Sequence, residues 1–239
     1  DQNSLQSLAL PLETAAKMSE CPAHIIIIDG EKGSGRKTLG FELALTLIYN
    51  NRKTALLAPQ DSSLASTIQK RGRLPAPLPP IPLISAENFT SAIKQYDAII
   101  IPEASTANGF AEFAATYITL LKHDKSSLKR FRQNQVYLTG IWELKKKIAA
   151  RHKHSLNWVV CENNLSANFQ ETPSPELLQM SRLYGFRATP PLNYRNTYKT
   201  NISGLSSQDK NTPEFKKTLT YEDICTRREI ERLAEFIFS

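Results

Sequence analysis

The stretch "IIIIDGEKGSGRKTLG", residues 25–40, decides the fold. It begins with four isoleucines, which are typical of a buried strand, continues through a glycine-rich turn and ends in a helical pattern. Four of the nine glycines of the chain lie in its last eleven residues. A strand, a glycine-rich turn and a helix N-terminus together direct backbone N–H groups and the positive end of a helix dipole at an anion. The stretch therefore predicts a loop that binds phosphate.

The usual pattern of such a loop is G-x-x-x-x-G-K-[ST], and two registers fit it here. Counted from Gly30 and Gly35, Arg36 takes the lysine position, Lys37 takes the hydroxyl position and Thr38 comes one place late. Counted from Lys37 and Thr38, Arg36 occupies the last glycine position. The loop either holds a nucleotide, mainly through its backbone, or persists only as the strand-to-helix turn that the fold needs. The candidate nucleotide-binding residues of this stretch are Gly30, Lys32, Gly33, Ser34, Gly35, Arg36, Lys37 and Thr38.

Apolar, β-rich runs alternate with amphipathic helices along the chain, which predicts an α/β fold. We expect a mostly parallel central sheet with helices on both faces, that is, three layers. The expected strands are His24–Asp29, Thr54–Ala58, Ile81–Ser85, Ala98–Pro102, Gln135–Thr139, Asn157–Cys161 and Phe186–Thr189. The expected helices are Lys37–Tyr49, Phe110–Lys122, Trp142–Arg151, Pro175–Tyr184 and Tyr221–Phe238.

A chain of 239 residues, 41% of them hydrophobic, suits one soluble domain. We expect that domain over residues 23–239, after an N-terminal extension of residues 1–22. The proline-rich residues 71–82 and the polar residues 201–213 read as surface excursions. No apolar run approaches the roughly 20 residues of a membrane span, and the first residues lack the features of a secretory signal. The three cysteines are far apart, which argues against a zinc ribbon or a disulfide framework and favours a reducing cytoplasm.

The formal net charge of +7 is concentrated in one segment. Between Lys122 and His154 there are ten Lys/Arg and two acidic residues, an excess of eight. Such a segment suits an anionic partner such as nucleic acid, or it is only a solvated helix face that aids solubility. The candidate anion- or DNA-binding residues are Lys129, Arg130, Arg132, Lys145, Lys146, Lys147 and Arg151.

The block "EKGSGRK" (31–37) resembles the phosphate loop of the ParA/MinD ATPases, whose pattern is K-G-G-x-G-K-[ST] with an extra signature lysine. Lys32 matches that lysine in the second register. Three later blocks resemble, in order and spacing, the MipZ family, ParA-like ATPases that position the bacterial division plane. These blocks are "LNWVVCENNLS" (156–166), "YGFRATPPLNYRNTYKT" (184–200) and "TRREIERLAEFI" (226–237).

The resemblance implies a P-loop NTPase fold of the ParA/MinD type with ATP and Mg²⁺ as cofactors. It implies a dimer with ATP sandwiched between two monomers, in which the signature lysine reaches the phosphates of the partner. It also implies nonspecific DNA binding, contact with the partition protein ParB, inhibition of FtsZ polymerisation, and a cytoplasmic location at the nucleoid or cell pole. Asn163 matches the asparagine that contacts adenine, and Thr38 matches the hydroxyl ligand of magnesium.

The chain departs from the family pattern where acidic residues are expected. In "LLAPQDSS" (56–63), Ala58 and Gln60 stand where the family has an Asp-x-Asp motif. In "YDAIIIPEAS" (96–105), Pro102 stands where the family has the aspartate that supports magnesium. Phosphoryl transfer depends on such groups, so we expect ATP hydrolysis to be weak or absent.

Three hypotheses remain. The first is a MipZ-like protein, an ATPase or a degenerate nucleotide-binding homologue, that regulates placement of the division site. The second is a nucleotide-independent basic module that binds nucleic acid or another anionic partner. The third is an active ATPase, whose weak candidate catalytic residues are Lys32, Lys37, Asp61 and Glu103.

Overall fold

The computed structural model describes residues 21–102, 109–152, 154–166, 168–193 and 195–239. Within them a sheet of eight strands has the order β3-β2-β4-β1-β5-β6-β7, and β8 also pairs with β6. All the strand pairs are parallel. The strands are β1 His24–Gly30, β2 Thr54–Leu57, β3 Leu83–Ile84, β4 Ala98–Ile101, β5 Ala114–Lys122, β6 Asn157–Asn164, β7 Arg187–Ala188 and β8 Leu192–Asn193.

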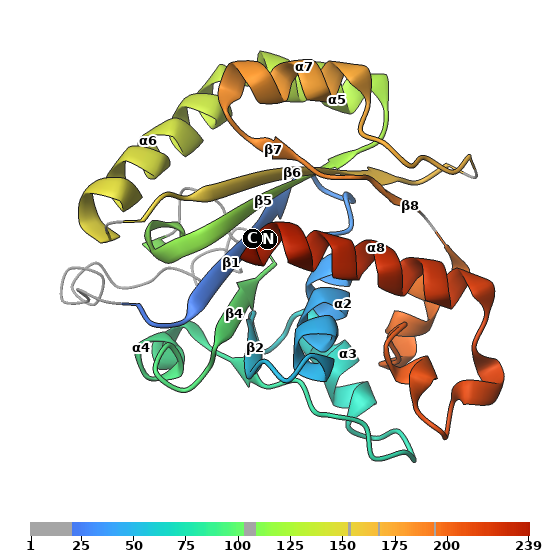
Figure 1. The fold of residues 1–239 in the computed structure, drawn as a ribbon. Coiled ribbons are helices and arrows are strands. Elements are labelled where there is room, and N and C mark those ends of the chain that lie inside the picture. The colour runs from blue at the N-terminus through green and yellow to red at the C-terminus, as the bar shows by residue number, and fades with distance from the viewer. Residues whose placement is uncertain (1–20, 103–108, 153, 167, 194) are drawn as a thin grey trace.

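Helices cover both faces of this sheet, as Figure 1 shows. The α-helices are α2 Arg36–Tyr49, α3 Ser63–Arg71, α4 Phe89–Ala92, α5 Lys125–Gln133, α6 Gln135–His152, α7 Pro175–Tyr184 and α8 Tyr221–Phe238. Short 3-10 helices connect them at η2 Ala86–Asn88, η3 Gly109–Phe113, η4 Asn196–Ser203, η5 Asp209–Asn211 and η6 Lys216–Thr218. The predicted three-layer α/β architecture with a parallel central sheet is therefore confirmed.

The core is divided by the sheet into two apolar clusters, and β1 contributes to both. Ile25 and Ile27 belong to the cluster beneath α4, α5, α6 and α7. Ile26 and Ile28 belong to the cluster beneath α2, α3 and α8. Successive strand residues point to opposite faces, so a run of four isoleucines is what a strand covered on both faces requires. Among the described residues, no helix combines the length and apolar character needed to cross a membrane.

Two predicted elements are wrong. The helix predicted over Phe110–Lys122 is instead the 3-10 helix η3 followed by β5, a central strand whose residues are nearly all buried. The strand predicted over Gln135–Thr139 is the first part of α6, which begins earlier than the predicted Trp142. The Asn134 side chain accepts a hydrogen bond from the Tyr137 amide (3.1 Å) and so helps to start α6.

Other elements differ in extent or were not predicted. β3 is only two residues long, against the predicted Ile81–Ser85, and α3, α4, α5 and β8 were not expected.

The polar segment 201–213 is not the exposed excursion that we predicted, because residues 206–210 are buried. Its Asp209 accepts two hydrogen bonds from Arg71 of α3 (2.5 and 2.8 Å), so a buried ion pair holds this segment against the domain. Of the predicted N-terminal extension, residues 1–22, the first 20 residues lie outside the described part of the chain.

Candidate functional site

The loop between β1 and α2 has the backbone geometry of an anion-binding turn. β1 ends at Gly30, and α2 begins at Arg36. The loop between them is residues 31–35, and its last residue, Gly35, is the N-cap of α2. Gly33 and Gly35 have φ of 79° and 97°, in the left-handed region that favours glycine. A Cβ on Gly35 would lie 2.7 Å from Asn163 Nδ2, and one on Gly30 would lie 2.2 Å from the Leu120 carbonyl oxygen. Glycine is therefore required at both positions.

This geometry has the spacing of the first register. Gly30 ends the strand, Gly35 precedes the helix, and Arg36 is its first residue. Arg36 is half-buried and Lys37 occupies the second helical position. The Lys37 ammonium donates a hydrogen bond to Ser63 Oγ (3.0 Å) at the start of α3. Lys32 is exposed in the turn.

The N-terminus of α2 offers hydrogen-bond donors without a side-chain acceptor. The helix has no side-chain N-cap bond and no acidic residue in its first turn. Its first backbone bond runs from the Leu39 amide to the Gly35 carbonyl (2.9 Å). Within the described residues, Ser34 Oγ is fully buried in the loop and has no hydrogen-bond partner. A phosphate group would satisfy such donors, and the helix dipole would favour its charge.

Lys122, which sequence reasoning did not assign to the site, lies against this loop. It is the last residue of β5 and pairs with Asn163 of β6. A Cβ built on Gly33 would lie 3.5 Å from Lys122 Nζ. The signal that could have found it is a lysine at the end of an apolar run. The prediction of a helix over that run hid the fact that the residue ends a strand at the carboxyl edge of the sheet.

A cavity of about 300 Å³ adjoins the loop. It brings together four of the predicted residues, Gly33, Gly35, Thr38 and Asn163. The Asn163 amide donates a hydrogen bond to the Ser34 carbonyl (2.8 Å) and so ties β6 to the loop. The remaining lining, which is mostly apolar, comes from Leu39, Leu165, Leu192, Tyr198, Lys199, Ile202 and Ile230. An apolar cavity with a few polar groups beside an anion site fits the base and sugar of a nucleotide.

At the described positions where the family carries acidic residues for magnesium chemistry, this chain has none. Ala58 and Pro102 are buried at the ends of β2 and β4, and Asp61 is exposed. Glu103 lies outside the described residues. Asp29, the acid nearest to the loop along β1, is engaged, because it accepts hydrogen bonds from the Tyr117 hydroxyl (2.6 Å) and the Gly30 amide (2.7 Å).

Over the part of the chain that the structure describes, no group of three His, Cys, Asp or Glu residues could hold a metal ion. Thr38, which was predicted to bind magnesium, is half-buried and lines the cavity. The residues present therefore fit the phosphate and base of a nucleotide, and Thr38 is the candidate Mg²⁺ ligand among the described residues that line the cavity.

Glu31 connects the loop to α5. Its carboxylate accepts hydrogen bonds from Ser127 Oγ and from the Arg130 guanidinium (2.7 Å). Partial burial acts to raise the pKa of Glu31, but the hydrogen bonds from Ser127 and Arg130 outweigh it and lower the pKa below its usual value. The contact therefore forms between charged groups at neutral pH.

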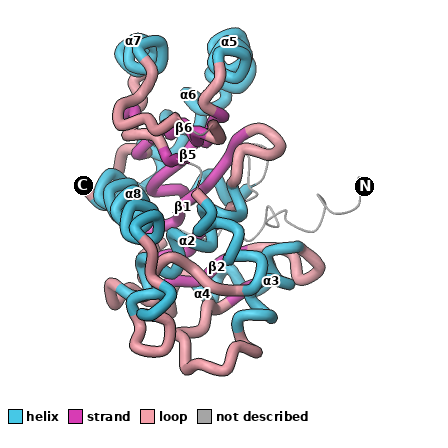
Figure 2. The backbone as a smooth tube through the Cα atoms, turned by 90° about the vertical axis from the view of Figure 1, so that its right-hand side faces the viewer, coloured by secondary structure: helices cyan, strands magenta, loops and turns pink. Residues whose placement is uncertain are grey.

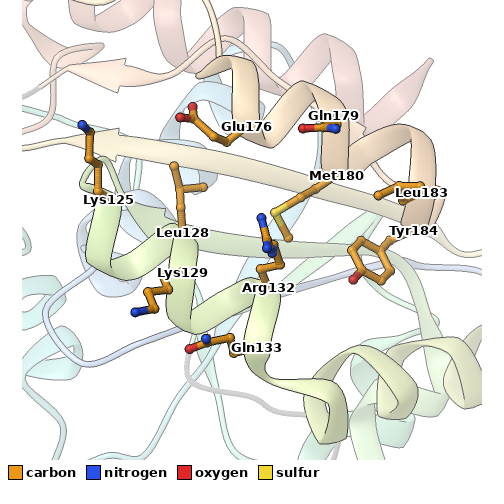
Figure 3. A pocket seen from close by; sticks show the side chains of 10 residues that line it. All are labelled: Lys125, Leu128, Lys129, Arg132, Gln133, Glu176, Gln179, Met180, Leu183 and Tyr184. Atoms are coloured by element: carbon orange, nitrogen blue, oxygen red, sulfur yellow. The ribbon is translucent and has the colours of Figure 1, made fainter.

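The predicted basic patch is divided among several environments. Arg130 pairs with Glu31, while Lys147 and Arg151 of α6 lie 3.7 and 3.2 Å from the Glu112 carboxylate. Lys145 donates to the Gly185 carbonyl (3.4 Å), and Lys146 lies over the Trp142 ring. Lys129 and Arg132 line a different cavity, between α5 and α7 (Figure 3).

Comparisons with known proteins bear on the family and on the fold of this chain. The sequence model of the family described as ATPase MipZ matches residues 94–237. No curated protein matches the sequence significantly.

Among solved structures, a putative plasmid partition protein of Borrelia burgdorferi bound to AMPPNP has a TM-score of 0.55 at 14% identity, covering 90% of this chain and 98% of that one. Cobyrinic acid a,c-diamide synthase of Mycobacterium smegmatis, with an ATP analogue and magnesium, also has a TM-score of 0.55, at 13% identity and 91% and 96% coverage. A nucleotide-binding protein of Archaeoglobus fulgidus in complex with ADP has a TM-score of 0.53 at 12% identity and 89% and 98% coverage. At identities of 12–14%, the likeness shows that these structures share the fold of this chain.

Proposed function

Because the chain belongs to the MipZ ATPase family, we propose that it binds ATP at the loop after β1 and hydrolyses it weakly or not at all. The observation that carries this proposal is the uncapped N-terminus of α2 beside the buried, unpartnered Ser34 hydroxyl. Backbone donors need no particular side chain, so they persist where a catalytic side chain is replaced.

The placement of the ligand follows from the cavity. The phosphates would meet the amides of Gly33–Thr38, with Lys122 adding positive charge beside Gly33. The base would enter the apolar part of the cavity next to Asn163 and Tyr198. Ala58, Gln60 and Pro102 supply no carboxylate for magnesium or for the attacking water, so turnover lacks its main electrostatic support.

The role that we propose for this protein is regulation of division-site placement. As in the family that it resembles, it would contact FtsZ and ParB, bind DNA nonspecifically and form a nucleotide-dependent homodimer. The domain is proposed to span residues 23–239 and to work in the cytoplasm, at the nucleoid or the cell pole.

The test is titration of the full chain with a fluorescent ATP analogue, paired with a phosphate-release assay. We expect saturable binding, and release no faster than that of a Gly35→Ala variant. Absence of saturable binding would contradict the nucleotide proposal, and brisk turnover would contradict weak hydrolysis. Sedimentation of FtsZ polymers and pull-down with ParB test the partners separately.

A second function, binding of DNA without nucleotide, is supported by the exposed cations of α6, Lys146 and Lys147. Counterion release would make such binding weaken steeply between low and moderate salt. Gel-shift titrations at two salt concentrations, with and without ATP, separate the two proposals. Affinity that does not change with salt would contradict the second one.

A further inference from the structure

A groove between α5 and α7 is separate from the nucleotide site. The two helices lie side by side on one face of the sheet (Figures 1 and 2), and the cavity between them has a volume of about 450 Å³. Leu128 of α5 and Met180 of α7 project into the space between the helices (Figure 3). Both are buried, whereas Leu183, farther along α7, is 71% exposed. The groove thus has an apolar floor that continues onto an exposed leucine.

One wall of the groove is basic. Lys125, Lys129 and Arg132 are spaced i, i+4 and i+7 on α5, so they lie on one helix face over about 10 Å. Within the described residues none of the three forms an ion pair, although Arg130 on the same helix pairs with Glu31. The other wall is different, because Glu176 in the first turn of α7 brings a negative charge.

We propose that this groove binds an amphipathic helix of a protein partner, with acidic residues along the flank that faces α5. An apolar stripe of that helix would cover Leu128, Met180 and Leu183. Its acidic residues would pair with the three cations, which repeat at helical spacing. A basic residue on its opposite flank would pair with Glu176.

This occupant fits the groove better than a polyanion does. A nucleic acid or an anionic bilayer would bring negative charge to both walls, and Glu176 would repel it. The apolar floor that continues onto Leu183 suits the apolar stripe of an amphipathic helix, whereas a polyanion has no such stripe to cover it. The proposal does not depend on nucleotide binding, since the groove shares no lining residue with the cavity beside the loop.

The test uses a labelled synthetic helix of about 18 residues, with leucines on one face, glutamates on one flank and lysines on the other. Its binding to the full chain is measured by fluorescence anisotropy at about 150 mM salt, with and without ATP. We expect Lys129→Glu and Leu183→Asp each to weaken binding by about tenfold or more. Lys94→Glu, the same charge change at an exposed lysine beyond α4, should change it less than about twofold.

Three outcomes would overturn the proposal. One is absence of saturable binding at about 100 µM protein, a concentration that even a weak specific complex reaches. Another is equal weakening by Lys94→Glu, which would mean attraction by net charge alone. The last is that Lys129→Glu weakens the binding of a duplex DNA probe and leaves the binding of the helix probe unchanged. Both groove substitutions are at exposed positions, and thermal unfolding checks that each variant folds.

Discussion

The loop after β1 and the strand ends after β2 and β4 lie at the same edge of the sheet, but they differ in how closely they match the features of a nucleotide site. The loop keeps the glycines and the free helix N-terminus from which an anion site is built. The strand ends carry Ala58 and Pro102 where carboxylates would be required. The difference teaches that a site made of backbone survives substitution, whereas a site made of side chains disappears with a few replacements.

The strongest way to break this comparison is to damage the backbone of the loop. Gly35→Ala places a Cβ 2.7 Å from Asn163 Nδ2 at a φ of 97°. Strain of about 1–3 kcal/mol predicts affinity for a fluorescent ATP analogue about 5- to 150-fold weaker. Gly72→Ala is the matched control, because Gly72 has a φ of −65° and its nearest contact would be 3.6 Å away. Unchanged affinity of Gly35→Ala would contradict a backbone-built site.

A side-chain contribution to the loop is expected to be smaller. Lys122→Ala should weaken the same binding by about three- to tenfold, because it removes one charge beside Gly33 at a partly exposed site. Lys37→Ala should weaken it by less than about twofold, because the Lys37 ammonium contacts Ser63. Titrations of both variants at one salt concentration give the ranking. The reverse ranking would mean that Lys37 turns into the loop when nucleotide binds.

Removing magnesium should also have a small effect. The described residues offer no carboxylate cluster for the ion, so it would be held mainly by the nucleotide phosphates, waters and Thr38. With so little protein ligation, a chelator should change nucleotide affinity by less than about threefold. A loss of tenfold or more would indicate a ligand outside the described residues. Glu103→Gln would then be the variant that abolishes the magnesium dependence.

The elements that the sequence predicts well carry their own boundary signals. The bounds of α7 and α8 agree with prediction. α7 begins after the N-cap Ser174 with a proline in its first turn and ends at Gly185, and α8 begins with a capping box of Thr220 and Asp223. Such signals act within a few residues of the chain and need no tertiary contact.

The errors fall where tertiary burial decides. β5 is buried on both faces, so its sequence lacks the alternation that distinguishes a strand from a buried helix. That error removed Lys122 from the predicted site. The polar residues around Asp209 read as a surface loop, because their partner Arg71 lies far away in the sequence. The candidate site was predicted where its signal is local, at the glycines of the loop.

The contact of Glu31 with α5 has a consequence for both proposed sites. Its carboxylate belongs to the loop, whereas Ser127 and Arg130 belong to the helix that forms one wall of the groove. A ligand that displaces this carboxylate changes the energy of α5 as well. If nucleotide binding changes the affinity of the groove for its helix by this route, thermodynamic linkage requires that the bound helix change ATP affinity by the same factor.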